Sequence, residues 1–190
     1  MKVAKVVISI ILLLSVLVTT AYAADPEGVV LSVKGFQTQE KTNWCWVACA
    51  RNSVRFERSV LRSQTAAVKK VKGANVNEGG TIAEIEKAAE YISYSNEDYD
   101  AISKKLSFDN LKSQVKRNNI TIACAGYYDS NNVRNGGHAV VIIGYVVNSN
   151  GNYVQYFDPW DGIPYICSYT QFCNGSYNNR KYDFTVYNNE

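Results

Sequence analysis

Helical periodicity is confined to the first part of this 190-residue chain, and β-type runs follow it. Apolar residues recur at helical spacing up to about residue 116, whereas β-branched and aromatic runs separated by turn residues dominate after residue 120. Helices followed by strands that short turns connect, such as the turn at 148–152, indicate an α+β fold with an antiparallel sheet. The expected helices cover residues 43–57, 81–92 and 107–116. The expected strands cover residues 120–125, 138–147, 153–158, 163–169 and 183–187.

Two of these helices begin with recognisable capping residues. Thr42 or Asn43 can be the N-cap of the first helix, because either side chain can accept a hydrogen bond from a backbone N–H of the first turn. Thr81 precedes the second helix and Glu84 follows three residues later, which is the pattern of a capping box. These signals place Cys45 at the N-terminal end of a helix.

The start of the chain has the composition of a secretory signal peptide. Lys2 and Lys5 precede the uncharged stretch 6–18, and Ala21-Tyr22-Ala23 follows as an A-x-A cleavage site. The uncharged stretch is shorter than the roughly 20 residues that a membrane-spanning helix needs, although an uncleaved anchor is the alternative. The expected organisation is a signal peptide at 1–23, a short lead-in at 24–36 and one domain at 37–190. We therefore expect a secreted, extracellular protein with no stable membrane association.

Charge and composition exclude several classes of function. The formal net charge is +3, but without Lys2 and Lys5 the chain carries 18 basic and 17 acidic residues. This balance argues against nucleic-acid binding, which requires clustered Lys and Arg. The chain has one histidine, and its cysteine spacings are not those of zinc ligands. We therefore expect no metal, no cofactor and no nucleic-acid partner.

The cysteines of the expected mature chain are odd in number. They are Cys45, Cys49, Cys124, Cys167 and Cys173. In an exported protein, an odd number leaves at least one thiol unpaired. Cys167 and Cys173 can close a short loop, although spacing alone does not assign the pairs. Cys49 and Cys124 can equally be small buried hydrophobic residues.

Cys45 is the preferred candidate for a catalytic nucleophile. The N–H groups and the dipole at a helix N-terminus stabilise a thiolate, and this field has fallen off at Cys49, one turn deeper. His138 is the only histidine and therefore the only candidate for an imidazole base. The expected hairpin brings Asp158 back beside His138, so that its carboxylate can orient the imidazole. The side-chain amide of Gln39 and the backbone N–H of Cys45 are the candidate donors to a substrate oxyanion.

These candidates match a known family in residue type and in order. The matching stretches are Gln39-x5-Cys45-Trp46, Gly137-His138-Ala139-Val140-Val141 and Asp158-Pro159-Trp160. They resemble the papain-like cysteine peptidases, and more narrowly the compact bacterial AvrRpt2-like and C39-like branches, over about residues 37–162. The resemblance implies that residues 37–190 form a papain-like domain with N-terminal helices packed on a C-terminal antiparallel sheet. It implies an oxyanion glutamine at Gln39, a nucleophile at Cys45, a base at His138 and an orienting carboxylate at Asp158.

Two residues depart from the compact branches, and neither departure removes a catalytic part. Val47 stands where those branches often have alanine, and Cys49 adds a second thiol one turn after the first. The tryptophans near these residues, Trp44, Trp46 and Trp160, are expected to be packing residues.

The expected function is hydrolysis of a peptide or protein substrate by a Cys-His-Asp triad through a thioester. Two alternatives stay open from the residues. The first is a papain-like module that binds a partner without cutting it, such as an immunity protein. The second keeps the thiol chemistry and changes the acceptor, as in a deamidase or a transglutaminase-like enzyme.

Overall fold

The computed structural model describes residues 26–54, 61–94 and 97–189. The expected signal peptide at 1–23 lies outside these residues. Five helices are described: α1 (Cys45–Ser53), α2 (Gln64–Lys72), α3 (Ile82–Ile92), α4 (Phe108–Lys116) and α5 (Tyr169–Asn174). Seven strands are described: β1 (Glu27–Val30), β2 (Tyr99–Ile102), β3 (Thr121–Tyr128), β4 (Arg134–Asn148), β5 (Gly151–Asp158), β6 (Ile163–Ser168) and β7 (Lys181–Asn188). No helix among these residues is long and apolar enough to cross a membrane.

All the described strands belong to one antiparallel sheet built around the long strand β4. The strand order is β2-β7-β3-β4-β5-β6, and β1 pairs separately with β4. The first half of β4 pairs with β3 and the second half with β1, while β5 follows its other edge. Gly144 permits the approach of β1, because a side chain there would lie 2.7 Å from the Val29 carbonyl oxygen. The residues expected as a lead-in therefore contribute an edge strand to the sheet.

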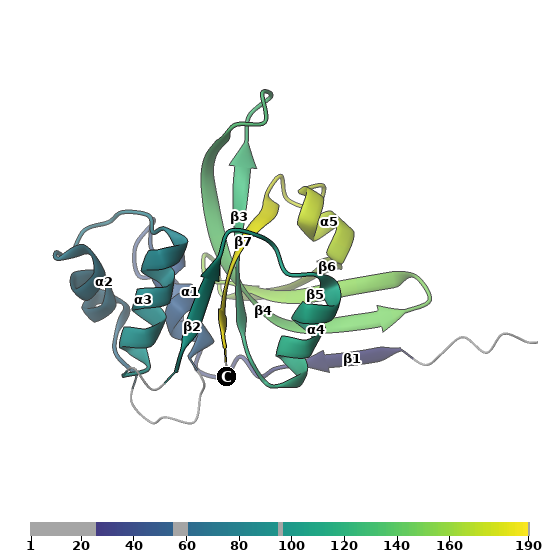
Figure 1. Cartoon of the computed structure of the whole chain (residues 1–190), viewed down its shortest axis with the longest axis horizontal. Coiled ribbons are helices and arrows are strands. Elements are labelled where there is room, and N and C mark those ends of the chain that lie inside the picture. Colours follow the sequence, from purple (N-terminus) through teal and green to yellow (C-terminus); the bar gives the residue numbers. More distant parts are fainter. Residues whose placement is uncertain (1–25, 55–60, 95–96, 190) are drawn as a thin grey trace, which may run out of the picture.

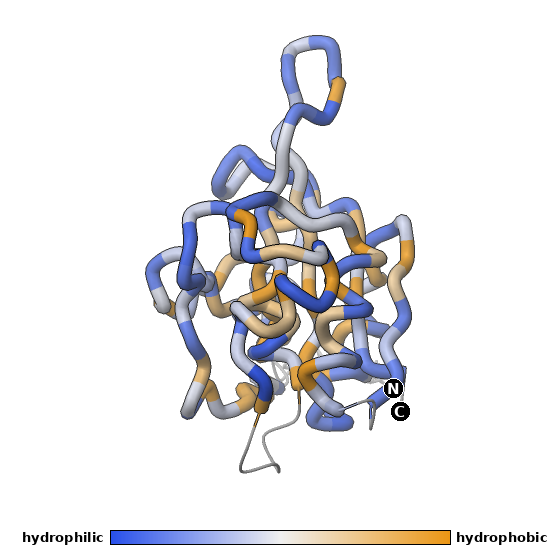
Figure 2. The backbone as a smooth tube through the Cα atoms, turned by 90° about the vertical axis from the view of Figure 1, so that its left-hand side faces the viewer, coloured by the Kyte–Doolittle hydropathy of each residue, from blue (hydrophilic) through white to orange (hydrophobic). Residues whose placement is uncertain are grey.

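Alternate residues of β4 face two separate cores, as the two-residue period of a strand dictates. Ala139, Val141 and Ile143 pack in the core that includes helices α1, α2 and α3. Val140 and Ile142 pack in the other core, with α4 and α5. Figure 1 shows α1–α3 gathered beside the sheet and α4 and α5 against another side of it. In Figure 2 the hydrophobic segments lie mainly inside the body, and the projecting β3–β4 hairpin is mostly hydrophilic.

The α+β class, with early helices packed on a later antiparallel sheet, is confirmed. The expected helices at 81–92 and 107–116 are α3 and α4, and Thr81 and Glu84 form the predicted capping box. The β4–β5 hairpin turns where it was expected, with Asn148 opposite Gly151. The second half of the chain therefore folds much as its β-branched runs predict.

The first helix differs from the prediction at both ends. It ends at Ser53 because Val54 is extended, with ψ 128°, so the expected end at residue 57 was wrong. Its N-cap is Trp44, which makes no side-chain capping bond. Asn77 engages the side chains of both expected caps, since its amide nitrogen donates to the Thr42 hydroxyl and its backbone carbonyl accepts from the Asn43 side-chain amide.

Four described elements were absent from the prediction: β1, α2, β2 and α5. Helix α2 is capped by Ser63 and carries Lys69, Lys70 and Lys72 in its last turn. Helix α5 has six residues and β2 has four, so each is too short for a clear periodic pattern.

Candidate active site

Cys45 is the first residue of α1, and a loop that precedes α3 holds this end of the helix. The indole nitrogens of Trp44 and Trp46 donate to the carbonyl oxygens of Val76 and Glu78 at 2.8 and 3.0 Å. Both indoles are buried, as expected for packing residues. The two bonds fix the start of α1 against residues 76–80, so the position of Cys45 is set by packing.

Two buried amide side chains hold the segment that leads to Cys45. Asn52 of α1 accepts from the Gln37 N–H and donates to the Gln37 carbonyl, both at 2.9 Å. Gln64 of α2 donates to the Thr38 carbonyl at 2.8 Å and accepts from the Glu40 N–H at 3.1 Å. This segment is thereby tied to two helices along its length.

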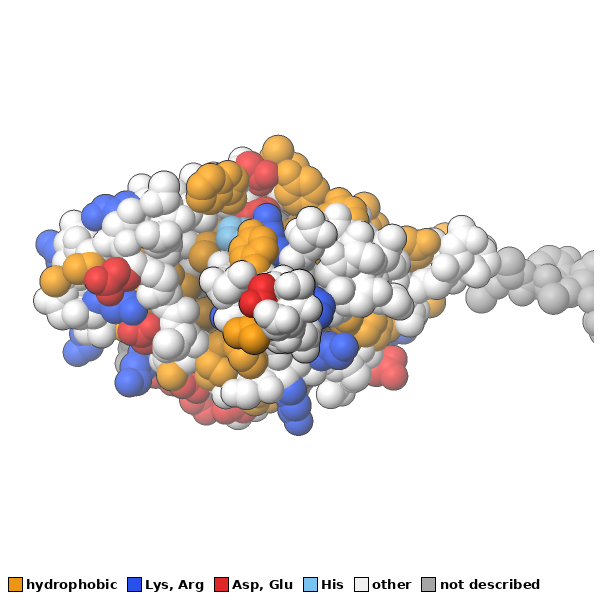
Figure 3. Space-filling view, turned by 90° about the horizontal axis from the view of Figure 1, so that it is seen from above, with side chains coloured by type: hydrophobic (Ala, Val, Ile, Leu, Met, Phe, Trp, Pro, Cys, Tyr) orange, Lys and Arg blue, Asp and Glu red, His pale blue; other side chains and the backbone are white. Residues whose placement is uncertain are grey.

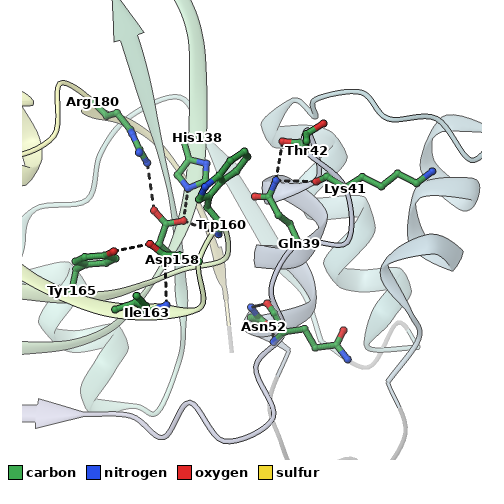
Figure 4. Close-up of polar contacts among 12 residues, drawn as sticks. Gln39, Lys41, Thr42, Asn52, His138, Asp158, Trp160, Ile163, Tyr165 and Arg180 are labelled. Carbon is green, nitrogen blue, oxygen red and sulfur yellow. Dashed lines mark hydrogen bonds and ion pairs between the residues drawn. The ribbon is translucent and has the colours of Figure 1, made fainter.

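His138 and Asp158 meet across the β4–β5 hairpin. Pairing in register ends at Val141 opposite Phe157, and the two site residues lie just beyond that end. The imidazole Nε2 lies 2.6 Å from Asp158 Oδ1 (Figure 4). Because Asp158 accepts from Nε2, Nδ1 is the ring nitrogen left to face Cys45, with which His138 forms a side-chain hydrogen bond.

Asp158 is buried and has two further partners. The backbone N–H of Trp160 donates to its Oδ1 at 2.9 Å. The guanidinium of Arg180 lies 3.5 Å from its Oδ2 and comes from the loop before β7 (Figure 4). Burial alone would raise the pKa of Asp158, but His138, the Trp160 N–H and Arg180 together hold that pKa below its usual value. Asp158 is therefore an anion with a fixed orientation.

The thiol of Cys45 and the imidazole of His138 shift each other's pKa in opposite directions. Burial favours the neutral thiol, but the hydrogen bond and charge of His138, with the N–H groups of Ala139 and Trp46, bring the pKa of Cys45 below its ordinary value. Burial also opposes the charged imidazole, yet hydrogen bonds to Asp158 and Cys45 raise the pKa of His138 to about 9. At neutral pH the arrangement favours a thiolate next to an imidazolium.

The other cysteines lack this environment. Burial raises the pKa of Cys49 far above its usual value, and it raises the pKa of Cys124 and Cys167 to about 12. All five cysteines are free thiols in the structure, so none of the pairs left open by spacing is formed. The environment of the two thiols therefore favours Cys45 over Cys49 as the candidate nucleophile.

Gln39 lies near the site, but its N–H groups are already engaged. Its side-chain nitrogen donates to the carbonyl oxygens of Lys41 and Thr42 at 2.9 and 2.8 Å (Figure 4). Its side-chain oxygen is buried without a hydrogen-bond partner among the described residues. The structure thus brings Cys45, His138 and Asp158 together and leaves no N–H of Gln39 free to face them.

Two cavities open on either side of Cys45 and His138. One, of about 330 Å³, extends between α1, α3 and the start of β4. The other, of about 310 Å³, is bordered by Trp160, Tyr127 and Arg180. Figure 3 shows the histidine at the bottom of a hollow flanked by hydrophobic side chains. Trp160 lines the second cavity and is 61% exposed, so the expectation that it is a packing residue was wrong.

Sequence reasoning missed Arg180 as a partner of Asp158. Arg180 lies 22 residues further along the chain, in a stretch rich in Asn and Tyr that has no recognisable motif. Only the fold of the α5–β7 loop brings it to the site. Among the described residues, no group of three or more His, Cys, Asp and Glu side chains could hold a metal ion.

The fold and the paired Cys and His side chains define the class of a papain-like cysteine peptidase. Among solved structures, the fold is similar to procathepsin L2 proteinase from Tenebrio molitor larval midgut, with a TM-score of 0.56 and 14% identity, covering 85% of this chain and 67% of that one. It is also similar to a structure from work on the mite allergens Blo t 1 and Der p 1, with a TM-score of 0.55 and 11% identity over 90% and 73% of the chains. No curated protein matches the sequence.

The family is shown by the sequence itself. Residues 30–183 match the model of the Peptidase_C39 like family. The chain therefore belongs to this family, and it is a cysteine peptidase of papain-like fold. Of the two compact branches that the sequence resembles, the match names the C39-like one.

Proposed function

We propose that this protein hydrolyses peptide bonds in peptide or protein substrates, with Cys45 as nucleophile, His138 as acid and base, and Asp158 as the orienting carboxylate. The observation that carries the proposal is the continuous contact from Cys45 through His138 to Asp158. It is accompanied by a lowered pKa for the thiol and a raised pKa for the imidazole. Nucleophile, base and orienting group are the parts of a catalytic triad.

The first half of the reaction forms a thioester. The Cys45 thiolate attacks the carbonyl carbon of the peptide bond, and the electron pair of the C=O bond moves onto oxygen. When that pair returns, the C–N bond breaks, and His138 gives its Nδ1 proton to the leaving amine. The products of this half are a free amine, an acyl group on Cys45 and a neutral imidazole.

The second half returns the enzyme to its starting state. Neutral His138 removes a proton from water, and the resulting oxygen nucleophile attacks the thioester carbonyl. The C–S bond then breaks, releasing a carboxylic acid and restoring the thiolate beside the imidazolium. Asp158 keeps Nδ1 directed at the reaction in both halves, because its carboxylate occupies Nε2.

The substrate oxyanion needs donors, and we assign the first to the backbone N–H of Cys45. This group belongs to the open first turn of α1, which has no side-chain cap to occupy its N–H groups. Gln39 is the second donor in the proposal. One of its N–H groups must then leave the carbonyl of Lys41 or Thr42 when substrate binds.

Peptide cleavage by purified variants tests the proposed function. Cys45→Ala and His138→Ala are each expected to lower kcat/KM by at least about 10³-fold, because members of a triad act as a unit. Cys173→Ser removes a half-buried thiol outside both cavities and is the matched control, with activity expected to stay near that of the unchanged protein.

Mass spectrometry of the products separates this function from the alternatives. Hydrolysis yields two shorter peptides, whereas deamidation leaves the chain uncut. Cleavage that persists in Cys45→Ala or His138→Ala, with the variant folded, would contradict the proposal.

A further inference from the structure

The cavity between α1, α3 and β4 combines an apolar wall with charged groups. Its wall includes the buried side chains of Trp46, Ile85 and Ala139, and Cys45 lies at its edge. Its volume of about 330 Å³ is at the lower end of the roughly 300–1,000 Å³ of small-ligand pockets. A substrate bound at Cys45 can therefore place one side chain in it.

The charges that line this cavity do not balance. Lys72 and Glu84 both line it and form an ion pair at 2.7 Å, so they largely cancel. Arg134 also lines it, but its partner Asp183 does not. Asp183 accepts from Arg134 Nε at 2.9 Å. If the Cys45–His138 pair is set aside, the charged residues that line the cavity are Lys72, Glu84 and Arg134. Of these, Arg134 alone has its ion-pair partner outside the cavity.

The guanidinium of Arg134 rests in a slot made by two glycines on neighbouring strands. Gly126 of β3 and Gly137 of β4 face each other in register. A β-carbon at Gly126 would lie 2.6 Å from Arg134 Nε, and one at Gly137 would lie 2.3 Å from Nη2. The guanidinium also lies over the ring of Phe184, 5.1 Å from its centre. Because both residues are glycines, the guanidinium of Arg134 can lie directly against the two strands.

The two Nη groups of Arg134 are available to a ligand. Nε donates to Asp183, and Tyr128 is a second hydrogen-bond partner of the Arg134 side chain. A guanidinium has five N–H groups, so these two partners leave N–H groups of Nη1 and Nη2 for a ligand. A guanidinium presents paired donors in a planar fork that matches a carboxylate. The side chain is 35% exposed, so a substrate can reach it without moving it.

We propose that this cavity selects substrates with an acidic side chain, whose methylene groups contact the apolar wall and whose carboxylate binds the Nη groups of Arg134. The inference rests on the proposed function, since the cavity borders the same nucleophile. Glutamate suits the site better than a neutral side chain of the same shape, because Arg134 carries a positive charge that the cavity itself does not balance. Arg134 is accordingly a specificity-determining residue.

Pairs of peptides that differ only by Glu or Gln test this inference. The cleavage site of the full protein is first located by mass spectrometry in a mixed peptide substrate. Each position around it is then varied between Glu and Gln, and the ratio of the two kcat/KM values is measured. At one position the ratio is expected to favour Glu by about tenfold, the effect of one charge-assisted hydrogen bond.

Variants at the ion pair distinguish a direct role from a structural one. Arg134→Gln is expected to lower the Glu/Gln ratio to about 1, and Arg134→Lys to retain part of the preference, since it keeps the charge without the fork. Asp183→Asn leaves Arg134 without its partner and is expected to raise the ratio. Lys181→Gln removes a nearby surface charge outside this cavity and is the control, with an unchanged ratio expected.

Each result supports or overturns the inference. A ratio near 1 at every position of an active protein would overturn it and leave the proposed function standing. So would equal losses for Glu and Gln peptides in both Arg134→Gln and Asp183→Asn, because the ion pair would then be only structural. Absence of any Cys45-dependent cleavage would reject the proposed function and this inference together.

Discussion

Cys45 and Cys49 show how strongly position within one helix controls a thiol. They lie one turn apart in α1, and the pKa of Cys45 is lowered while that of Cys49 is raised. Cys45 is half-buried whereas Cys49 is buried, and burial is the main cause of the raised pKa of Cys49. Partners add to this difference, because His138 and two backbone N–H groups contact Cys45, whereas the charged forms of the neighbours of Cys49, two thiols and a carboxylate, oppose its ionisation.

Asp158→Asn tests the electrostatic coupling within the proposed triad. The pH dependence of kcat/KM is expected to be bell-shaped, rising as the Cys45 thiol loses its proton and falling near pH 9 as His138 loses its own. The carboxylate raises the pKa of His138, so its removal should move the falling limb to lower pH by about one unit or more. The pH profile of peptide cleavage measures this shift.

Asp161→Asn is the matched control for that profile. Asp161 lies three residues away and binds the Tyr165 hydroxyl and the Ile163 N–H, not His138. The falling limb of the pH profile of Asp161→Asn should lie at the same pH as in the unchanged protein. An unshifted limb in Asp158→Asn would contradict the account of His138.

At the scale of elements, the site depends on how firmly the start of α1 is held against its surroundings. The helix is not capped by its own side chains, and the segment before it is fastened by Asn52 and Gln64 instead. Because these two amides come from α1 and α2, the approach to Cys45 is correct only when both helices are packed. Helix packing and catalysis are thus linked through a few buried hydrogen bonds.

Asn52→Ala is expected to reduce both stability and activity. It removes two hydrogen bonds to the Gln37 backbone, which should lower the free energy of unfolding by about 1–2 kcal/mol. It also frees the segment that leads to Cys45, so kcat/KM should fall in the variant that is still folded. Urea unfolding and peptide cleavage measure the two effects.

Ser107→Ala provides a control of similar cost at a distant place. Ser107 caps α4 by accepting from the Asn110 N–H, and loss of such a cap costs about 1 kcal/mol. This variant should lose stability and keep its kcat/KM. Equal losses of activity in Asn52→Ala and Ser107→Ala would show that Asn52 acts only through global stability.

The sequence was sufficient to predict the elements whose sequence signals are local. The β-branched run of β4 and the turn after it predict a hairpin, and that hairpin alone brings His138 to Asp158. The capping box predicts the start of α3. These features depend on neighbours in the chain, which is why they are visible without a structure.

Features that depend on distant residues were missed or misplaced. Asn77 engages the side chains of Thr42 and Asn43, the expected caps of α1, from a position 35 and 34 residues further along the chain. Arg180 reaches Asp158 through an irregular loop. The bonds of Gln39 to the carbonyl groups of Lys41 and Thr42 are local, but they follow from an irregular turn of the segment and not from the spacing of Gln39 to Cys45. Neither tertiary contacts nor irregular turns produce a periodic sequence pattern.

At the scale of the whole molecule, the site lies where two layers meet. Helices α1–α3 provide Cys45, and the central hairpin of the sheet provides His138 and Asp158. Each cavity beside the thiol is lined by residues from both layers. A substrate that reaches Cys45 therefore lies between helices and sheet.

We propose that this domain is exported and acts outside the cell. The proposal rests on the basic residues, the uncharged stretch and the A-x-A site within residues 1–23. Expression of the full chain in a bacterial host should release a protein whose first residue is Ala24, as measured by N-terminal sequencing of the medium or periplasm. Retention of Met1 on a membrane-bound product would contradict it.

The central claim is that Cys45 is held as a thiolate by His138. Iodoacetamide labelling of the native protein at about pH 5.5 tests it most directly, because ordinary thiols, with pKa near 8.5, are protonated there. We predict rapid labelling of Cys45, with Cys173 as the slow internal reference, and loss of that rapid labelling in His138→Ala. Labelling of Cys45 no faster than Cys173, or undiminished in His138→Ala, would contradict the claim.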